Sequence, residues 1–499
     1  MKRKYNLSLK YLLGTLLLLC MSCEEGFEDL SKNPNQPLDV EAKNLISSIE
    51  ASMAYEISYR ANTQILNLWV QHMAASQYPE EDQYVLRDGD INNIWNMIYN
   101  TPLNDAQVIV DKGTELQNNQ LIGIGKVLKV FLFSYLSDLF GDIPFSEALQ
   151  GSPEKGDLLT PKYDDQSTLY PQLITELDEA LASLDQFNPD LSSNINGEDL
   201  MFGGDVGLWK RFANSLKLRL WMRLSEKDEN AAKAAIMAMD VSDMMEDNLH
   251  TAKVVFLNNN GNATAAHLTG RDQDFRLSKT LADYMIGNGT RANPEDPRLP
   301  VYATPTPDNN DYVGIPNGMK GLNSVKDDDG SSFTFKNTSQ LGQAFLQRDS
   351  PMWIMTYAEV LFLQAEAAQR WGAFGGDAKA LYEKAVMASA SQYNITDMAK
   401  VADLLNGTAS YDDAADKLAL IMTQKWVALF TQGNEAFADW RRTGLPALSP
   451  SVDNLNEDKI PRRLPYPTEE FSVNKSNIDA AIANQGEAGY NGRVWWDQP

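Results

Sequence analysis

Apolar side chains recur at intervals of three and four residues along most of the chain, a spacing typical of amphipathic helices. The stretch from Leu121 to Leu139 shows it most clearly, and Gly141 follows where we expect that helix to end. The same spacing predicts further helices, over residues 167–184, 209–225, 229–241, 350–371 and 376–393. The fold class that we predict is therefore mostly α.

The last two of these predicted helices would form a hairpin. Ser350 is a favourable N-cap, Pro351 suits the first helical position, and Gly372 would end the helix. Asp377 would cap the second helix, and the small Ala365 would let the two helices approach closely. The pair resembles a tetratricopeptide hairpin, a repeat of about 34 residues. Other helical pairs are less regular, so we expect helical hairpins packed against another body.

The stretch from about 251 to 348 differs from the helices, because it is rich in Gly, Pro, Asn and Asp. Loops of this length are uncommon in compact proteins unless they have a function. Binding residues often lie on loops that a rigid frame supports. We therefore predict an irregular, loop-rich half that packs against the helices and carries ligand-binding residues.

Residues 1–22 are typical of a lipoprotein signal peptide. Basic residues at positions 2, 3, 4 and 10 precede an apolar run over 11–20, which is too short to span a bilayer. Ser22 is small and stands directly before Cys23, so we predict cleavage there and lipidation of Cys23. Lipidation of Cys20 is less favoured, because the bulky Leu19 precedes it. An ordinary secretory signal with incidental cysteines is the other alternative.

The mature chain, residues 23–499, is predicted to be one domain that begins with an acidic tether over 24–40. Because Cys20 and Cys23 are the only cysteines, it would hold no disulfide. In the full sequence, signal peptide included, acidic residues outnumber basic ones, 68 to 43, for a formal net charge of −25. Such a surface repels nucleic acid and anionic headgroups, so we expect no nucleic-acid partner and contact with the membrane only through the lipid anchor. No apolar run after residue 22 approaches the roughly 20 residues of a spanning helix.

Sequence signals for catalysis are scarce. The chain has no G-x-S-x-G, no phosphate-binding glycine loop and no H-E-x-x-H. Its histidines, His72, His250 and His267, are too scattered to suggest a metal site. The acidic run at 327–330 lacks the alternating spacing of a calcium loop, so a solvated turn is the preferred interpretation over a bound calcium. We expect a protein that is not an enzyme and needs no cofactor or metal.

Aromatic residues in turn-rich surroundings suggest a ligand pocket between the loop 76–90 and the region 271–317. Aromatic faces with polar groups at the rim suit flat, hydroxylated ligands. In this prediction two tyrosines form apolar platforms, three polar residues supply hydrogen bonds at the rim, and two further rings close the far side. The platforms are Tyr78 and Tyr84, the rim residues are Gln77, Arg87 and Asp272, and the rings on the far side are Phe275 and Tyr312. The alternative is that these rings cover small cores beneath the loops.

The C-terminal third contains the string "ALIMTQKWVALFTQGNEAFADWRRTGLP". Phe437 and Trp440 would point inward, Asp439 would pair with Arg442, and Asn434 would cap the helix that Gly444 ends. With "FEDLSKNPNQP", "WNMIYNTPLNDA", "YLSDLFGDIPFSEA" and the closing "RVWWDQ", this string resembles the SusD/RagB family of Bacteroidetes outer-membrane lipoproteins.

This resemblance implies four tetratricopeptide-like hairpins beside an irregular half that carries the ligand loops. It implies a partner, a SusC-like TonB-dependent transporter, and a function in capturing oligosaccharides or peptides without enzymatic activity. The acidic "EEGFED" after Cys23 is similar to the signal that sends such lipoproteins to the cell exterior. A cell-surface, outer-membrane nutrient-binding lipoprotein is thus our functional prediction. A surface glycoside hydrolase and a tetratricopeptide scaffold for protein interactions remain as alternatives.

Overall fold

The predicted helices account for most of the regular structure in a computed structural model that describes residues 40–151, 156–189, 195, 197–256, 261–271 and 273–497. The signal peptide and Cys23 therefore lie outside the described residues. From Ala42 onward the described chain forms one compact unit. The longer helices, of eight residues or more, are α3 (Ala42–Met53), α5 (Asp88–Ile98), α6 (Asn104–Glu115), α7 (Asn119–Phe140), α8 (Gln166–Asp185), α9 (Val206–Arg223), α10 (Glu229–Met237), α11 (Ala263–Gly270), α12 (Lys279–Ile286), α14 (Tyr357–Trp371), α15 (Ala378–Gln392), α16 (Met398–Asn406), α17 (Lys417–Ala428), α18 (Gly433–Thr443) and α20 (Lys475–Gln485).

Shorter elements connect these helices. Two π-helical segments occur among the described residues, η1 (Ala54–Leu66) and η2 (Tyr99–Leu103). Short helical turns are α4 (Asn67–Trp69), η5 (Val241–Asp243), η6 (Asn248–His250), α13 (Leu299–Tyr302), η7 (Gln343–Phe345) and α19 (Glu470–Val473). The strands are β1 (Met73–Ala75), β2 (Ala252–Val254), β3 (Phe275–Leu277) and β4 (Met352–Met355), which pair antiparallel as β1 with β3 and β2 with β4.

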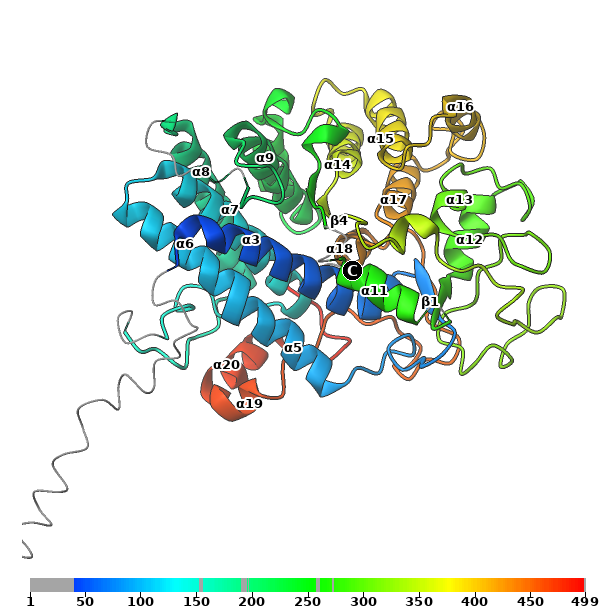
Figure 1. The fold of residues 1–499 in the computed structure, drawn as a ribbon, viewed down its shortest axis with the longest axis horizontal. Coiled ribbons are helices and arrows are strands. Elements are labelled where there is room, and N and C mark those ends of the chain that lie inside the picture. Colours follow the sequence, from blue (N-terminus) through cyan, green and yellow to red (C-terminus); the bar gives the residue numbers. More distant parts are fainter. Residues whose placement is uncertain are drawn as a thin grey trace, which may run out of the picture. The chain divides into compact units, whose positions relative to one another are not determined.

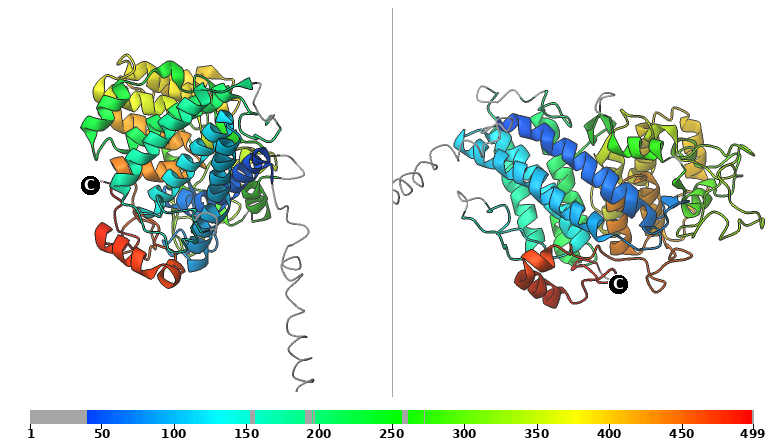
Figure 2. Two further views of the ribbon diagram at one scale, coloured as in Figure 1. Left: turned by 90° about the vertical axis from the view of Figure 1, so that its left-hand side faces the viewer. Right: turned by 60° about the horizontal axis from the view of Figure 1, so that its bottom comes forward.

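The long helices lie side by side, most of them next to a sequence neighbour, while α9 packs against the more distant α14. Figure 1 shows α8, α9, α14 and α15 in a row, with α7 packed against α8 and α6 against α7. The predicted loop-rich stretch contains α11, α12 and α13, but its longest part, residues 303–342, is held mainly by isolated bridges such as Ala303 to Leu341. These loops lie at the end of the unit away from α8 (Figure 2). The structure thus confirms helical hairpins packed against an irregular half.

Local capping signals define several helix ends. Helix α7 ends at Gly141 as predicted, and at its start Asn118, which was not predicted as a cap, accepts hydrogen bonds from the backbone nitrogens of Gln120 and Leu121. Gly372 ends α14 in a left-handed conformation with φ 70°, which glycine adopts without strain. Asp377 accepts from the Ala380 nitrogen and caps α15, as predicted.

The predicted start of the α14 helix is wrong. Residues Met352–Met355 form strand β4 instead, paired with β2, which lies about a hundred residues earlier. The helix begins only at Tyr357, where the Thr356 hydroxyl accepts a hydrogen bond from the Glu359 nitrogen at 3.1 Å. Ser350 and Pro351 therefore precede a strand, because pairing with a distant segment overrides the local N-cap signal.

Helix α18 ends at Gly444 as predicted, but its first turn is capped differently. The Asn434 backbone nitrogen donates to Asn62 Oδ1 at 2.8 Å, and Asn62 Nδ2 donates to Asn434 Oδ1 at 3.0 Å. The predicted cap by Asn434 is thus replaced by a side chain from η1. Gly433 permits this approach, since a Cβ atom there would lie 2.7 Å from the Asn67 backbone nitrogen.

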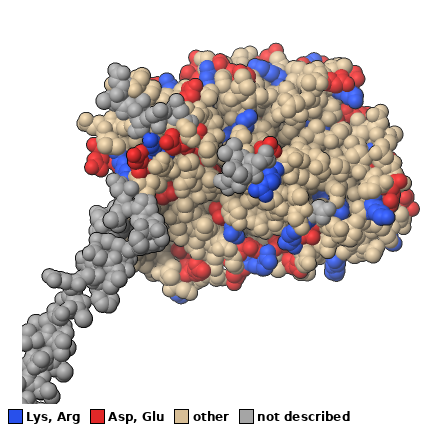
Figure 3. Space-filling view, in the orientation of Figure 1, with Lys and Arg blue, Asp and Glu red and all other residues tan. Residues whose placement is uncertain are grey.

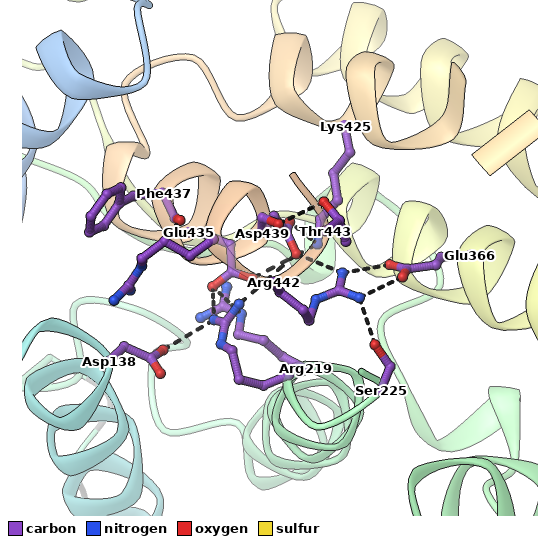
Figure 4. A network of polar contacts seen from close by, with 12 residues as sticks. Asp138, Arg219, Ser225, Glu366, Lys425, Glu435, Phe437, Asp439, Arg442 and Thr443 are labelled. Carbon is purple, nitrogen blue, oxygen red and sulfur yellow. Dashed lines mark hydrogen bonds and ion pairs between the residues drawn. The ribbon is translucent and has the colours of Figure 1, made fainter. Parts of the chain in front are cut away.

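A buried network of charged side chains joins α18 to α9 and α14 (Figure 4). Arg442 donates to the two Glu366 oxygens at 2.6 and 2.8 Å and to Asp439 Oδ1 at 2.9 Å. The last contact confirms the predicted pairing of Asp439 with Arg442. Arg219 binds both oxygens of Glu359 at 2.7 Å. Phe437 and Trp440 on the same helix are buried, as predicted.

The cations of this network lower the pKa of Asp439 and Glu366, whereas for Glu359 burial outweighs the neighbouring Arg219 and raises the pKa. Burial alone would raise the pKa of Asp439, but neighbouring cations, led by Lys425 and Arg442, lower it. Burial also opposes ionisation of Glu366, and Arg442 again outweighs it and lowers the pKa. Because a buried charge without its partner is costly, the packing of these helices depends on the network being complete.

Helix α7 has the composition of a membrane-spanning helix but is buried inside the fold. Among the described residues it is the one helix long and apolar enough to cross a bilayer, contrary to our expectation that no run would approach that length. However, 83% of its most apolar window is buried inside the fold. Its apolar side chains pack against neighbouring helices, as in the core helix of a globular domain.

Candidate ligand-binding site

A cavity of about 530 Å³ lies between the loop that follows β1 and the segment from α11 to β3. This is the size range of small-molecule sites. It combines aromatic rings with amide, carboxylate and guanidinium groups. Its lining residues are Gln64, Leu68, Gln77, Tyr78, Glu80, Glu81, Val85, Arg87, His267, Arg271, Asp274 and Phe275.

Strand pairing brings the two sides of this cavity together. In the β1–β3 ladder Ala75 lies opposite Phe275, and the Ser76 nitrogen donates to the Asp274 carbonyl at 2.8 Å. Figure 1 shows α11 and β1 close together on the side that faces the viewer. Two segments about 200 residues apart in sequence therefore form opposite walls.

Asp82 anchors the loop after β1. Its carboxylate accepts hydrogen bonds from the Ala75 nitrogen at 2.9 Å, from the Gly318 nitrogen at 2.8 Å and from Asn317 Nδ2 at 2.8 Å. Burial raises the pKa of Asp82 to about 7, and these hydrogen bonds act in the opposite direction. The loop that carries Gln77 and Tyr78 is thus tied to the irregular half from within.

Four of the predicted site residues line the cavity: Gln77, Tyr78, Arg87 and Phe275. The Tyr78 side chain is accessible, with the residue 63% exposed, and the Arg271 guanidinium carbon lies 4.9 Å from its ring centroid. Arg87 is held by Glu81 at 3.1 Å and by Asp90 at 2.8 Å. The structure thus brings these four together at one cavity.

Tyr84 and Tyr312 do not line the cavity. Tyr84 is 2% exposed, its hydroxyl accepts a hydrogen bond from the Ser451 nitrogen at 2.9 Å, and its ring packs edge-on against Trp69. Tyr312 is 7% exposed and belongs to the main core. Turn-forming neighbours in sequence therefore misled the prediction of exposure, because Tyr84 is held by the distant Ser451 and Tyr312 packs into the main core. Asp272 lies outside the described residues.

Several lining residues were missed by sequence reasoning, notably Gln64, His267, Arg271 and Asp274. They come from η1, from α11 and from the turn after it, so no short motif unites them. His267 lies between two rings, with its centroid 4.8 Å from that of Tyr59 and 5.9 Å from that of Phe275. The sequence offered no reason to place this histidine at a site, because the three histidines are scattered along the chain.

His267 is a neutral polar group at this cavity. Burial lowers its pKa below the usual value, and the nearby Arg271 lowers it further. Its Nε2 atom is buried without a hydrogen-bond partner among the described residues. The imidazole is therefore an uncharged part of the cavity wall at neutral pH.

Charges at the cavity largely neutralise one another. Arg87 pairs with Glu81, and Arg271 pairs with Asp274. On the face shown in Figure 3, acidic and basic side chains are likewise interspersed, despite the net negative charge of the chain. Hydrogen-bonding groups without a strong local field suit a neutral, hydroxylated ligand better than an ion.

A second cavity of about 630 Å³ lies among α6, α7, α8 and the loop after α7. Its lining is more polar, and its rings, Phe133 and Phe145, pack edge-on against each other.

The described residues contain no group of three or more His, Cys, Asp or Glu placed to hold a metal ion. In the acidic run at 327–330, Asp327 binds Arg291 at 2.8 and 3.0 Å. The first cavity therefore remains the best candidate site.

Comparison with protein families matches residues 34–467 to the family described as SusD-like, "Starch-binding associating with outer membrane". A search of curated proteins finds no match. Among solved structures, a chitin-binding protein is similar at 27% identity and a TM-score of 0.80, covering 92% of this chain and all of its own. A chitin-binding SusD homologue from Flavobacterium johnsoniae is similar at 26% identity and a TM-score of 0.77, covering 92% of this chain and 98% of its own.

A SusD homologue from Bacteroides uniformis shares the fold. It is 24% identical, with a TM-score of 0.78, and covers 92% of this chain and all of its own. The helical hairpins and the irregular half described above are thus common to these proteins.

Proposed function

The chain belongs to the SusD-like family, whose members are outer-membrane-associated binding proteins, and from this premise we propose that it binds oligosaccharides in the cavity between β1 and β3. The observation that carries the proposal is the accessible Tyr78 ring beside Phe275, with Gln77, Gln64 and His267 around them. Two similar solved structures are chitin-binding proteins, which supports a glycan as the ligand class.

The chemistry of the cavity suits sugars. A pyranose ring offers an apolar face of C–H groups and a rim of hydroxyls, so it needs a flat apolar surface edged by hydrogen-bonding groups. Tyr78 supplies such a surface, and the amides of Gln64 and Gln77 can both donate and accept. Because its arginines are already paired with carboxylates, the cavity favours neutral glycans over acidic ones.

Replacing Tyr78 with alanine is expected to lower glycan affinity by about 1–3 kcal/mol, a fivefold loss or more. Isothermal calorimetry with chitin and starch oligosaccharides and a peptide panel measures this. The melting temperature should stay nearly constant, because the ring is mostly exposed. Phe471→Ala removes an exposed ring on α19 and is the matched control, expected to bind like the parent.

Unaltered binding by Tyr78→Ala, for a ligand that the parent protein binds, would place the site elsewhere. The same incubations test the enzymatic alternative, since a glycoside hydrolase would shorten the oligosaccharides and a binding protein would return them intact. Preference for peptides over every glycan would redirect the proposal to peptide capture.

We further propose that the protein is anchored through a lipid on Cys23, faces the cell exterior and delivers its ligand to a SusC-like TonB-dependent transporter. The signal-peptide pattern before Cys23 and membership of the family support this. Cys23→Ser should move the protein from the membrane fraction to the soluble fraction, because the protein surface without acyl chains would not hold it durably at the membrane. Affinity purification of the parent after gentle detergent extraction should recover a large barrel protein.

Retention of Cys23→Ser in the membrane with unchanged acyl labelling would disprove the anchor, and Cys20→Ser is the control that should remain attached. Purification of the parent without any barrel partner would count against delivery to a transporter and leave binding itself untouched.

A further inference from the structure

A row of aromatic rings continues from the cavity along the π-helix η1. The Tyr59 ring centroid lies 4.8 Å from that of His267, which lines the cavity, and 5.3 Å from that of Tyr55. Tyr55 is 38% exposed and Tyr59 is partly exposed. The accessible aromatic surface therefore extends beyond the cavity itself.

The two tyrosines are four residues apart, and the π-helical geometry of η1 adds polar partners to their rings. Its hydrogen bonds span five residues, so side chains five apart can meet, whereas in an α-helix they point to different sides. Arg60, five residues after Tyr55, has its guanidinium carbon 5.4 Å from the Tyr55 ring centroid. Gln64, five residues after Tyr59, donates to the Tyr59 hydroxyl at 3.3 Å. Gln64 also lines the cavity, so the row and the cavity share a residue.

Polar groups border the row as they border the cavity. Arg60 is fixed by Glu56 at 2.8 Å and keeps about a quarter of its side chain exposed. Burial raises the pKa of the Tyr59 hydroxyl, which remains a neutral donor at physiological pH. A ring that only packs in the core is covered by other side chains, as Tyr84 is. Tyr55 instead presents its ring beside a fixed guanidinium at the surface.

We propose that Tyr55, Tyr59 and Arg60 form a second subsite, which binds sugar units of a neutral oligosaccharide whose other end occupies the cavity. This inference rests on the proposed function and extends it to a preference for longer chains. The centroid spacing between these rings is comparable to the length of one pyranose unit, so successive sugars of one chain can meet successive rings. Continuity with the cavity through Gln64 and His267 identifies the occupant as the same glycan chain.

The test compares short and long members of two series by calorimetry: chitobiose with chitohexaose, and maltose with maltohexaose. The parent protein should bind the longer member of at least one series more tightly. Tyr55→Ala should weaken binding of that longer member by about 2- to 10-fold and leave the shorter one unchanged. Tyr55→Phe keeps the ring and should bind like the parent, whereas Tyr78→Ala in the cavity should weaken both members.

Equal affinity of the parent for short and long members would overturn the subsite and leave the cavity intact. So would equal effects of Tyr55→Ala on both lengths, or no effect on either. If the parent binds no member of either series, or if Tyr78→Ala binds like the parent, the proposed function fails and the subsite fails with it.

Discussion

Arg442→Ala is expected to lower the free energy of unfolding by about 3–5 kcal/mol. Arg442 is fully buried and makes hydrogen-bonded ion pairs with Glu366 and Asp439. Removing it leaves these carboxylates short of a partner in a water-poor interior, where Arg370 is the one cation that Glu366 would keep within the described part of the chain. The cost of unpaired buried charge exceeds the cost of the lost contacts themselves. Urea-induced unfolding, followed by circular dichroism, measures the shift in midpoint.

Lys475→Ala is the matched control, because Lys475 pairs with Asp479 at 2.8 Å on the exposed surface of α20. Exposed pairs at this helical spacing contribute about 0.3–0.5 kcal/mol, so the control midpoint should barely move. A midpoint for Arg442→Ala within error of this control would contradict the role of the network in joining α9, α14 and α18.

Tyr84→Ala is expected to destabilise the protein by about 3–5 kcal/mol while glycan affinity stays unchanged. The Tyr84 ring is buried against Trp69, so its removal leaves a cavity that the surrounding core fills only in part. The Ser451 nitrogen would also lose its acceptor. Thermal and urea unfolding measure the first effect, and calorimetry on folded protein below the transition measures the second.

Tyr84→Phe separates the ring from the hydroxyl. It keeps the packing and removes one hydrogen bond, so a loss of about 1–3 kcal/mol is expected. The opposite pattern for Tyr84→Ala, with stability retained and binding lost, would contradict the structural role of this ring and show that it contributes to ligand binding.

Local chemistry allowed much of the helical frame to be predicted from the sequence. The apolar spacing from Leu121 to Leu139, the stops at Gly141 and Gly372, and the cap at Asp377 all act within one or two turns of a helix. Such signals need no knowledge of distant residues. The order of short motifs along the chain likewise indicated the SusD-like family, which the match over residues 34–467 confirms.

The errors occurred where distant segments decide the outcome. Residues 352–355 became a strand because β2 offers a partner, although Ser350 and Pro351 would suit a helix start. Asn62, on η1, took over the cap of α18 across 372 residues of sequence. The free energy of such long-range contacts competes with local propensity, and the residues next to these positions in sequence give no sign of the contacts.

The candidate site depends on tertiary structure more than the helices do. The sequence by itself singled out Gln77, Tyr78, Arg87 and Phe275, because aromatic and polar residues stand among turn formers there. The same pattern also pointed to Tyr84, which the structure buries beneath a segment 367 residues away. His267 and Gln64 had no signal in sequence, since only the β1–β3 pairing and the π-helix place them at the cavity. Burial is a property of all the segments that cover a side chain, and a linear pattern reports only its neighbours.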